Sequence, residues 1–217
     1  GGVSVATPDN LNAITANPAG LGISRGYQSG MYFPFDSVFT IYKSKRIKGF
    51  GYDLKYQFID GKFPDTFNPA DGNIGFGAAL FSNAYAGIKW NKHHFIDFGF
   101  LYRPINQVSF GLNSRFNDEL AKYHESTLGI ALRPFFKHHL TLGADVNILD
   151  NDSTIIYPHI TIEPIDGMLI SARSNADFDN YQINLAFNFG KVNIFYPSSY
   201  NADSDYSGGI GFYTDTE

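Results

Sequence analysis

A two-residue alternation of apolar and polar side chains runs through most of this chain from about Tyr27 onward. Residues 140–148 show it best, because every second residue there is Leu, Ala, Val or Ile and those between are Thr, Gly, Asp or Asn. Successive side chains of a strand point to opposite faces, so each such segment has one apolar and one polar face. Segment after segment repeats the pattern between turn residues, which is typical of a transmembrane β-barrel with lipid outside and a polar lumen inside.

Counting the alternating runs between Gly, Pro, Asn and Asp residues predicts about fourteen strands. Most are eight to eleven residues long, as expected of tilted strands that cross a membrane. The predicted strands lie near residues 25–34, 36–44, 47–58, 73–82, 84–91, 94–103, 107–116, 125–134, 138–148, 153–163, 166–174, 179–189, 191–197 and 206–214.

The predicted connections alternate between short and long, which a bacterial barrel does with its periplasmic turns and outer loops. One set is tight and comprises 44–46, 82–83, 104–106, 134–137, 164–165 and Gly190. The other set contains the longer connections 59–72, 117–124 and 198–205. An even strand number then places both termini on one side, which we take to be the periplasm of a bacterium with an outer membrane.

The composition excludes several classes of protein. Only 17% of the residues are charged, against about 25% in soluble domains, and no run of about 18 apolar residues indicates a membrane helix. The net charge of −5 gives no basic stripe for nucleic acid. The absence of cysteine excludes disulfides, thiolate metal sites and cysteine nucleophiles.

These observations favour an all-β fold, a transmembrane antiparallel β-barrel of about 14 strands with a short N-terminal helical plug. The rival interpretation is a soluble β-sandwich or a lipocalin-like barrel. Aromatic residues near the predicted strand ends fit the two membrane interfaces, although Tyr and Phe are also common in strands generally. We divide the chain into a plug segment, residues 1–24, and a barrel, residues 25–217.

The plug segment is too polar for a membrane strand and suits a short helix. Thr7 or Asp9 can cap such a helix, Pro8 is tolerated in its first turn, and the pair Asn17-Pro18 ends it. A barrel of about fourteen strands is too wide for its own side chains to fill. We therefore expect the segment to lie in the lumen or across its periplasmic mouth.

The motif Asn17-Pro18-Ala19-Gly20-Leu21-Gly22 resembles the Asn-Pro-Ala motif ahead of the first strand in the FadL-like family of outer-membrane barrels. That family includes transporters of fatty acids and hydrocarbons and the PorV and PorQ proteins of type IX secretion. The resemblance implies fourteen strands and an N-terminal plug. The segment Leu132-Arg133-Pro134, followed by residues 140–145, is also similar to barrel segments that precede some signal-peptide-peptidase-like proteases. The chain departs from the FadL-type transporters in lacking their large outer loops.

Ionisable residues of both signs fall on the predicted lumen face. They can form a selectivity lining, or they can pair across a polar, hydrated lumen and hold the plug. These residues are Asp53, Lys55, Lys89, Asp97, Arg103, Arg133, Asp145, Glu163, Arg173 and Lys191.

We find no motif for catalysis, metal binding or a cofactor. The chain has no Gly-x-Ser-x-Gly elbow, no His-Glu-x-x-His and no phosphate-binding glycine loop. The adjacent pairs His93-His94 and His138-His139 cannot chelate one metal from a regular strand, because neighbouring side chains point to opposite faces. We expect no enzymatic activity, no metal and no cofactor.

Two functions remain. The first is an outer-membrane anchor or adaptor, PorV-like, that holds a protein partner or an appended periplasmic domain among the lipids and lipopolysaccharide. The short loops and the acidic end of the chain favour it. The second is a FadL-like channel for hydrophobic small molecules, for which the inward apolar residues Phe95, Leu101, Leu169 and Phe195 would line the path. The same four residues could instead pack against the plug.

Overall fold

A computed structural model describes residues 4–8, 13–23, 27–35, 39–47, 49–58, 71–117, 122–135, 139–151, 153–201 and 205–216. Two short helical elements precede fourteen strands among these residues. The helical elements are α1 (Ala13–Ala16) and the 3-10 turn η2 (Pro18–Gly22). The strands are β1 (Tyr27–Pro34), β2 (Phe39–Ile47), β3 (Phe50–Phe58), β4 (Asp71–Phe81), β5 (Ala84–Asn91), β6 (Phe95–Ile105), β7 (Val108–Asn117), β8 (Lys122–Leu132), β9 (Leu140–Leu149), β10 (Thr154–Ile165), β11 (Met168–Ser174), β12 (Asn180–Phe189), β13 (Val192–Asn201) and β14 (Asp205–Thr216).

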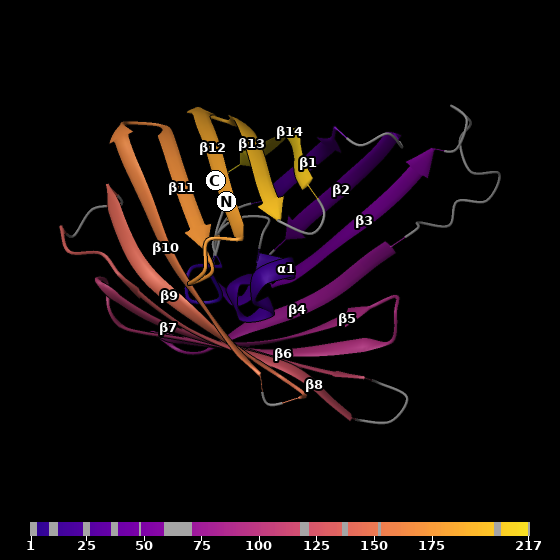
Figure 1. Cartoon of the computed structure of the whole chain (residues 1–217), viewed down its shortest axis with the longest axis vertical. Coiled ribbons are helices and arrows are strands. Elements are labelled where there is room, and N and C mark those ends of the chain that lie inside the picture. Colours follow the sequence, from indigo (N-terminus) through magenta and orange to yellow (C-terminus); the bar gives the residue numbers. More distant parts are fainter. Residues whose placement is uncertain are drawn as a thin grey trace.

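Each strand pairs antiparallel with the strands before and after it in sequence (Figure 1). The first and last strands also pair, from Tyr27 opposite Thr216 to Pro34 opposite Gly209, so the ring of strands returns to its start. Pairing of this kind leaves no edge strand with unsatisfied backbone groups. The prediction of an all-β antiparallel fold is confirmed.

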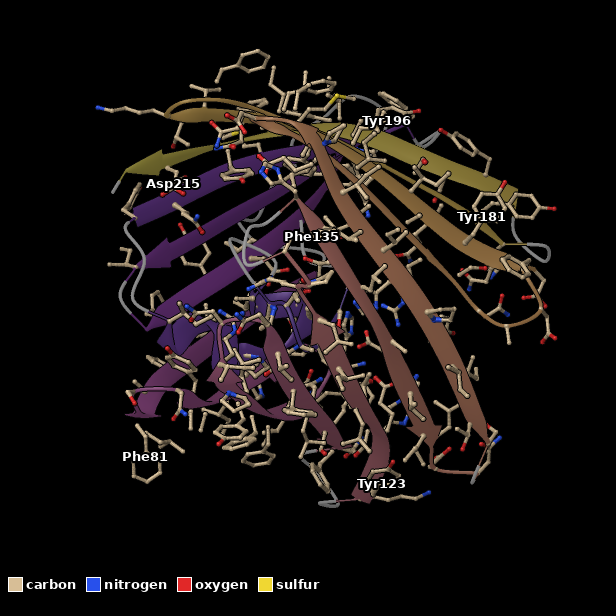
Figure 2. The ribbon with its side chains drawn as sticks, turned by 90° about the vertical axis from the view of Figure 1, so that its left-hand side faces the viewer. Phe81, Tyr123, Phe135, Tyr181, Tyr196 and Asp215 are labelled. Atoms are coloured by element: carbon tan, nitrogen blue, oxygen red, sulfur yellow. The ribbon has the colours of Figure 1, made fainter. Side chains whose placement is uncertain are left out.

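The two faces of the strands differ as the alternation predicts. On β6, the outward residues Phe98 and Phe100 are 50% and 40% exposed, whereas the inward residues Asp97 and Leu101 are fully buried. Large apolar side chains cover the outside on most strands, and in Figure 2 Phe81 at one end and Tyr181 at the other point away from the barrel. An apolar outside with polar groups inside reverses the usual arrangement of a protein in water.

The connections at the end that holds the C-terminal end of β14 are mostly two residues long. They comprise 48–49, 82–83, 106–107, 166–167 and 190–191, with 133–139 the exception. At the opposite end the connections 118–121 and 175–179 are longer, and 59–70 spans twelve residues outside the described part of the chain.

Several predicted connections are shifted in the structure, such as 104–106 to 106–107 and 164–165 to 166–167, and two others change more. The turn expected at residues 44–46 lies instead at 48–49, where Gly49 has a φ of +82° that suits a tight turn. The last long loop, expected at 198–205, shortens to 202–204 because Ser198 pairs with Gly208 and β13 continues to Asn201. The alternation of short and longer connections survives both changes.

The N-terminal segment lies within the ring of strands, where Figure 1 shows α1 beside the inner side of the sheet. Its elements α1 and η2 contact β3, β4, β5 and β6. The helical part is shorter than predicted, since α1 has four residues and η2 is a 3-10 turn. Asn17 does not simply end a helix but caps the turn that follows it. Asp9, one of the two proposed caps, lies outside the described residues.

Candidate functional site

Asn17 is fully buried and joins three parts of the molecule. Its side-chain Oδ1 accepts a hydrogen bond from the backbone N–H of Ala19 at 3.0 Å. Its Nδ2 donates to the carbonyl of Val5 at 2.9 Å and to the carbonyl of Phe100, on β6, at 3.0 Å. One carboxamide therefore caps η2, holds the preceding segment and fixes both to the wall. A carboxylate at this position would lack both donors.

The rest of the motif is shaped by close backbone contact. A Cβ added to Gly20 would lie 2.3 Å from the carbonyl oxygen of Pro8, and one added to Gly22 would lie 2.7 Å from the carbonyl carbon of Ala78 on β4. Pro18 occupies the first position of η2, where its missing N–H costs no hydrogen bond. The sequence Asn-Pro-Ala-Gly-Leu-Gly thus meets a steric requirement as well as a hydrogen-bonding one.

The wall beneath this segment is lined with glycine. We use the name glycine strip for the inward glycines of five adjacent strands, Gly75 and Gly77 on β4, Gly87 on β5, Gly99 on β6, Gly111 on β7 and Gly129 on β8. The pairing places Gly87 opposite both Gly77 and Gly99, and it places Gly111 opposite Gly129.

The segment rests directly on the backbone of the glycine strip. A Cβ at Gly87 would lie 2.3 Å from the carbonyl of Pro18, and one at Gly111 would lie 2.1 Å from the carbonyl oxygen of Val5. Real Cβ atoms essentially never approach so closely, and the neighbour is backbone, which cannot rotate away as a side chain can. Glycine is therefore needed for the backbone of the N-terminal segment to approach the backbone of the wall so closely.

Two further hydrogen bonds hold residues 4–6 against the wall. Ser4 donates from its hydroxyl to Oδ1 of Asp145 on β9 at 2.6 Å. Ser109 on β7 donates from its hydroxyl to the carbonyl of Ala6 at 2.5 Å. Asp145 and Ser109 are both buried, so water does not compete strongly for these bonds.

A buried ionic group crosses the inner face of β5 to β8. Nζ of Lys89 lies 2.6 Å from Asp97, and Arg115 binds both oxygens of Asp97 at 2.9 and 3.1 Å. Arg115 also contacts Glu125 at 2.6 Å. The group contains two cations and two anions and is neutral, as burial requires. The sequence prediction selected Lys89 and Asp97 but missed Arg115 and Glu125, although both lie on the polar face of their strands.

A second ionic pair lies on β9 and β11. A guanidinium nitrogen of Arg173 is 3.7 Å from Asp145, and the guanidinium carbon lies 4.3 Å from the ring centre of Tyr157 on β10. His159, directly opposite Arg173 in the pairing, is only 5% exposed. Asp145 thus receives both a hydroxyl from the N-terminal segment and a cation from the opposite side.

The other predicted lumen residues have separate surroundings. Asp53 accepts a hydrogen bond from Asn73 at 3.1 Å, and Arg103 lies 3.4 Å from the hydroxyl of Ser109. Glu163 accepts from the backbone N–H of Gly167 at 3.0 Å and so caps the turn between β10 and β11.

The structure says less about the other three predicted lumen residues, which are Arg133, Lys191 and Lys55. Arg133 is half-buried just after β8, and Lys191 is exposed in the turn before β13. Lys55 belongs to β3, but its side chain lies outside the described part of the structure.

Two polar cavities open on the inner face of the barrel. One, of about 170 Å³, is lined by Asn147, Tyr157, Arg173, Asn180 and Gln182. The other, also of about 170 Å³, is lined by Tyr32, Gln182, Asn184, Pro197, Ser198, Ser199, Ser207 and Gly208. They share Gln182, and both lie on strands that the glycine strip does not include.

The inward apolar residues do not mark a common path. The ring of Phe95 lies 5.1 Å from that of His124, and the ring of Phe195 lies 6.0 Å from that of Tyr32. Leu101 is fully buried and Leu169 is half-buried. The cavities in the described part of the barrel are lined mainly by polar residues, and none of these four residues lines them.

Among the residues that the structure describes, no group of three or more His, Asp or Glu side chains could hold a metal ion. None of the described helices is long and apolar enough to cross a membrane.

Comparison with known proteins identifies the fold. No protein-family model matches the chain, and no curated protein matches its sequence. The solved structure of the outer membrane protein Omp33 of Acinetobacter baumannii is similar, with a TM-score of 0.60 at 8% identity over 90% of this chain and 100% of that one. A triple mutant of Rhodopseudomonas blastica porin has a TM-score of 0.54 at 9% identity over 88% of this chain and 99% of that one.

These likenesses support the broad prediction and leave the finer one unsupported. Both solved structures are outer-membrane barrel proteins, and identities of 8% and 9% speak for the fold alone. The FadL-like and PorV-like resemblance finds no support in them. The chain has the fold of the outer-membrane β-barrel porins, with its own N-terminal segment bound to the inner wall.

Proposed function

We propose that this chain is a bacterial outer-membrane β-barrel whose lumen is narrowed by a permanently bound N-terminal segment, and that it serves as a membrane anchor for a protein partner or an appended periplasmic domain. The proposal includes no enzymatic activity. The apolar outside and the porin-like fold support the membrane location. The two-residue turns at the end that holds the end of β14 support a periplasmic position for that end.

The observation that carries the anchor proposal is the way the N-terminal segment is bound. A gate must leave its site at a modest cost in free energy. Here Asn17, Ser4 and Ala6 each make a hydrogen bond to the wall, Asn17 makes two more within the segment, and the glycine strip fits the backbone closely. A segment held at so many points is a structural part of the barrel and is poorly suited to open and close.

A second function, a channel for small solutes, has one observation in its favour. The two polar cavities show that the lumen is not filled on the side of β10 to β14. Their polar lining favours polar solutes over the hydrophobic molecules of a FadL-like channel, and nothing in the described residues marks an apolar tunnel.

Single-channel recording in planar lipid bilayers tests the anchor proposal. We expect purified wild-type protein to give little or no steady conductance, and Gly87→Ala, which displaces the segment, to give a clear increase. A matched variant, Gly72→Ala, changes a glycine whose added Cβ meets only the flexible end of Leu54, at 3.0 Å. Large, steady conductance of the wild type would reject the anchor proposal and support the channel.

A cross-linked variant distinguishes a fixed segment from a mobile one. In this cysteine-free chain, Ile14→Cys with Gly75→Cys places two thiols close together, since Cγ1 of Ile14 lies 3.6 Å from the position of a Cβ at Gly75. We expect the disulfide to leave the conductance unchanged. A fall in conductance on oxidation, reversed by reduction, would show that the segment moves during conduction.

A further inference from the structure

The inner face of β12 carries a row of carboxamides that line both cavities. Asn180 and Gln182 line the first cavity, and Gln182 and Asn184 line the second. Residues two apart on a strand share a face and are separated by roughly 6.8 Å. The row therefore presents three carboxamides along the lumen at nearly regular intervals.

These carboxamides are not used by the fold, whereas several others on the inner face are. Asn73 donates to Asp53, Asn91 donates to Asn73 at 2.8 Å, and Asn113 donates to Asp97 at 3.4 Å. The side chains of Asn180, Gln182 and Asn184 make no hydrogen bond to any other residue in the described parts of the chain, and Gln182 is exposed. Asn147, which also lines the first cavity, does bind the protein, because it accepts from Thr127 and donates to Glu125. The unbonded carboxamides of the two cavities are therefore the three on β12.

The residues that line the two cavities favour a polar ligand without net charge. Arg173 is the one formal charge among the described residues that line the two cavities, and Asp145, 3.7 Å away, balances it. A carboxamide offers both donors and an acceptor, which matches hydroxyl groups that also donate and accept. The hydroxyls of Ser199 and Ser207, 2.7 Å apart, add to this capacity at the second cavity.

Aromatic rings and the size of the cavities narrow the class of ligand further. Tyr157 lines one cavity and Tyr32 the other, and each adds an apolar surface beside polar groups. Cavities of about 170 Å³ each admit only small molecules. We propose that the β12 carboxamides form a binding site for a small neutral polyhydroxylated solute, a mono- or disaccharide. This site is independent of the anchor function, because it requires only that the cavities be reachable from one end of the barrel.

Isothermal titration calorimetry tests the site, with glucose and maltose as probes and the full chain in an amine-oxide detergent. Sugar-headed detergents are avoided because they would compete. We expect measurable binding of at least one sugar, weakened about tenfold or more by the double variant Gln182→Ala with Asn184→Ala, since two hydrogen bonds are lost. Both side chains are unused by the fold, so the variant is expected to remain folded. Its heat-modified mobility on electrophoresis confirms this.

The matched control is Gln107→Ala, which removes a carboxamide from the turn between β6 and β7, away from both cavities. It is expected to bind sugar within about twofold of the wild type, a change of about 0.4 kcal/mol. Failure of both sugars to bind up to their solubility limit overturns the proposal. So does equal binding by the double variant, or a preference for sodium acetate over the sugars, which would indicate an anion site at Arg173. None of these results bears on whether the barrel conducts.

Discussion

The substitution Gly87→Ala tests the glycine strip most directly. The added methyl group would lie 2.3 Å from the carbonyl carbon and oxygen of Pro18 and 2.6 Å from the nitrogen of Ala19. All three are backbone atoms. The backbone of β5 and that of the N-terminal segment are both held on each side of the contact. The segment must therefore move away from the wall, because β5 is fixed by its pairing with β4 and β6.

The structure gives the size of the effect. Displacing the segment breaks its three hydrogen bonds to the wall, from Asn17 to Phe100, from Ser4 to Asp145 and from Ser109 to Ala6, at roughly 1 kcal/mol each. It also exposes Leu21, now 1% exposed, at a cost of about 2 kcal/mol. The sum is about 5 kcal/mol, which corresponds to a loss of roughly three to four orders of magnitude in the local protection of the segment.

Amide hydrogen exchange with mass spectrometry, on protein in detergent micelles, measures this loss. The amides to follow are those of Ala19 and Gly20, which donate to the side chain and the carbonyl of Asn17. We expect Gly87→Ala to remove most of their protection and Gly72→Ala to leave it within about tenfold of the wild type, because the latter meets only a flexible side chain. Protection that is unchanged in Gly87→Ala would refute the argument that the wall requires glycine.

Three further predictions concern the buried polar groups, each measured as the urea midpoint of unfolding in micelles. Asn17→Asp keeps the acceptor but removes both donors, and we expect a loss of about 2 kcal/mol or more; an unchanged midpoint would contradict the capping role. Asp97→Ala leaves the buried Lys89 without its anion and the partly exposed Arg115 with Glu125 alone, and a loss of about 3–5 kcal/mol is expected, whereas a loss below about 1 kcal/mol would show that water reaches the group. Ser109→Ala removes one hydrogen bond to Ala6 and is expected to cost about 1 kcal/mol; a cost several times larger would point to a role beyond this bond.

Most strands of the barrel could be predicted from the local alternation of apolar and polar residues. Strand β9 occupies residues 140–149 against a prediction of 138–148, with the predicted faces, because its alternation is nearly perfect. The turn at 48–49 was misplaced because the polar residues Ser44, Lys45 and Arg46 look like an exposed turn, whereas Gly49 with its positive φ determines the real one. Local chemistry identifies strands well and places their ends less well.

The residues of the candidate site come together only through contacts between segments that are far apart in the sequence, so no single segment predicts them. The strip from Gly75 to Gly129 becomes continuous only through the pairing register of five strands. A signal was nevertheless present, since glycine recurs on the polar face of consecutive predicted strands. The partners of Asn17 could not have been predicted, because the carbonyl of Phe100 is 83 residues away in the chain. Arg115 was missed for a similar reason, as its partners lie on two other strands.

The bound N-terminal segment also constrains the order of assembly. Its residues are synthesised before the strands of the barrel, but the surface that receives them extends to Asp145 on β9. Until β4 exists, Ile14 and Leu21 have no wall to pack against, and until β9 exists Ser4 lacks its partner Asp145. Because the segment precedes its own binding site in the sequence, its contacts form late during folding, after β4 to β9 have paired.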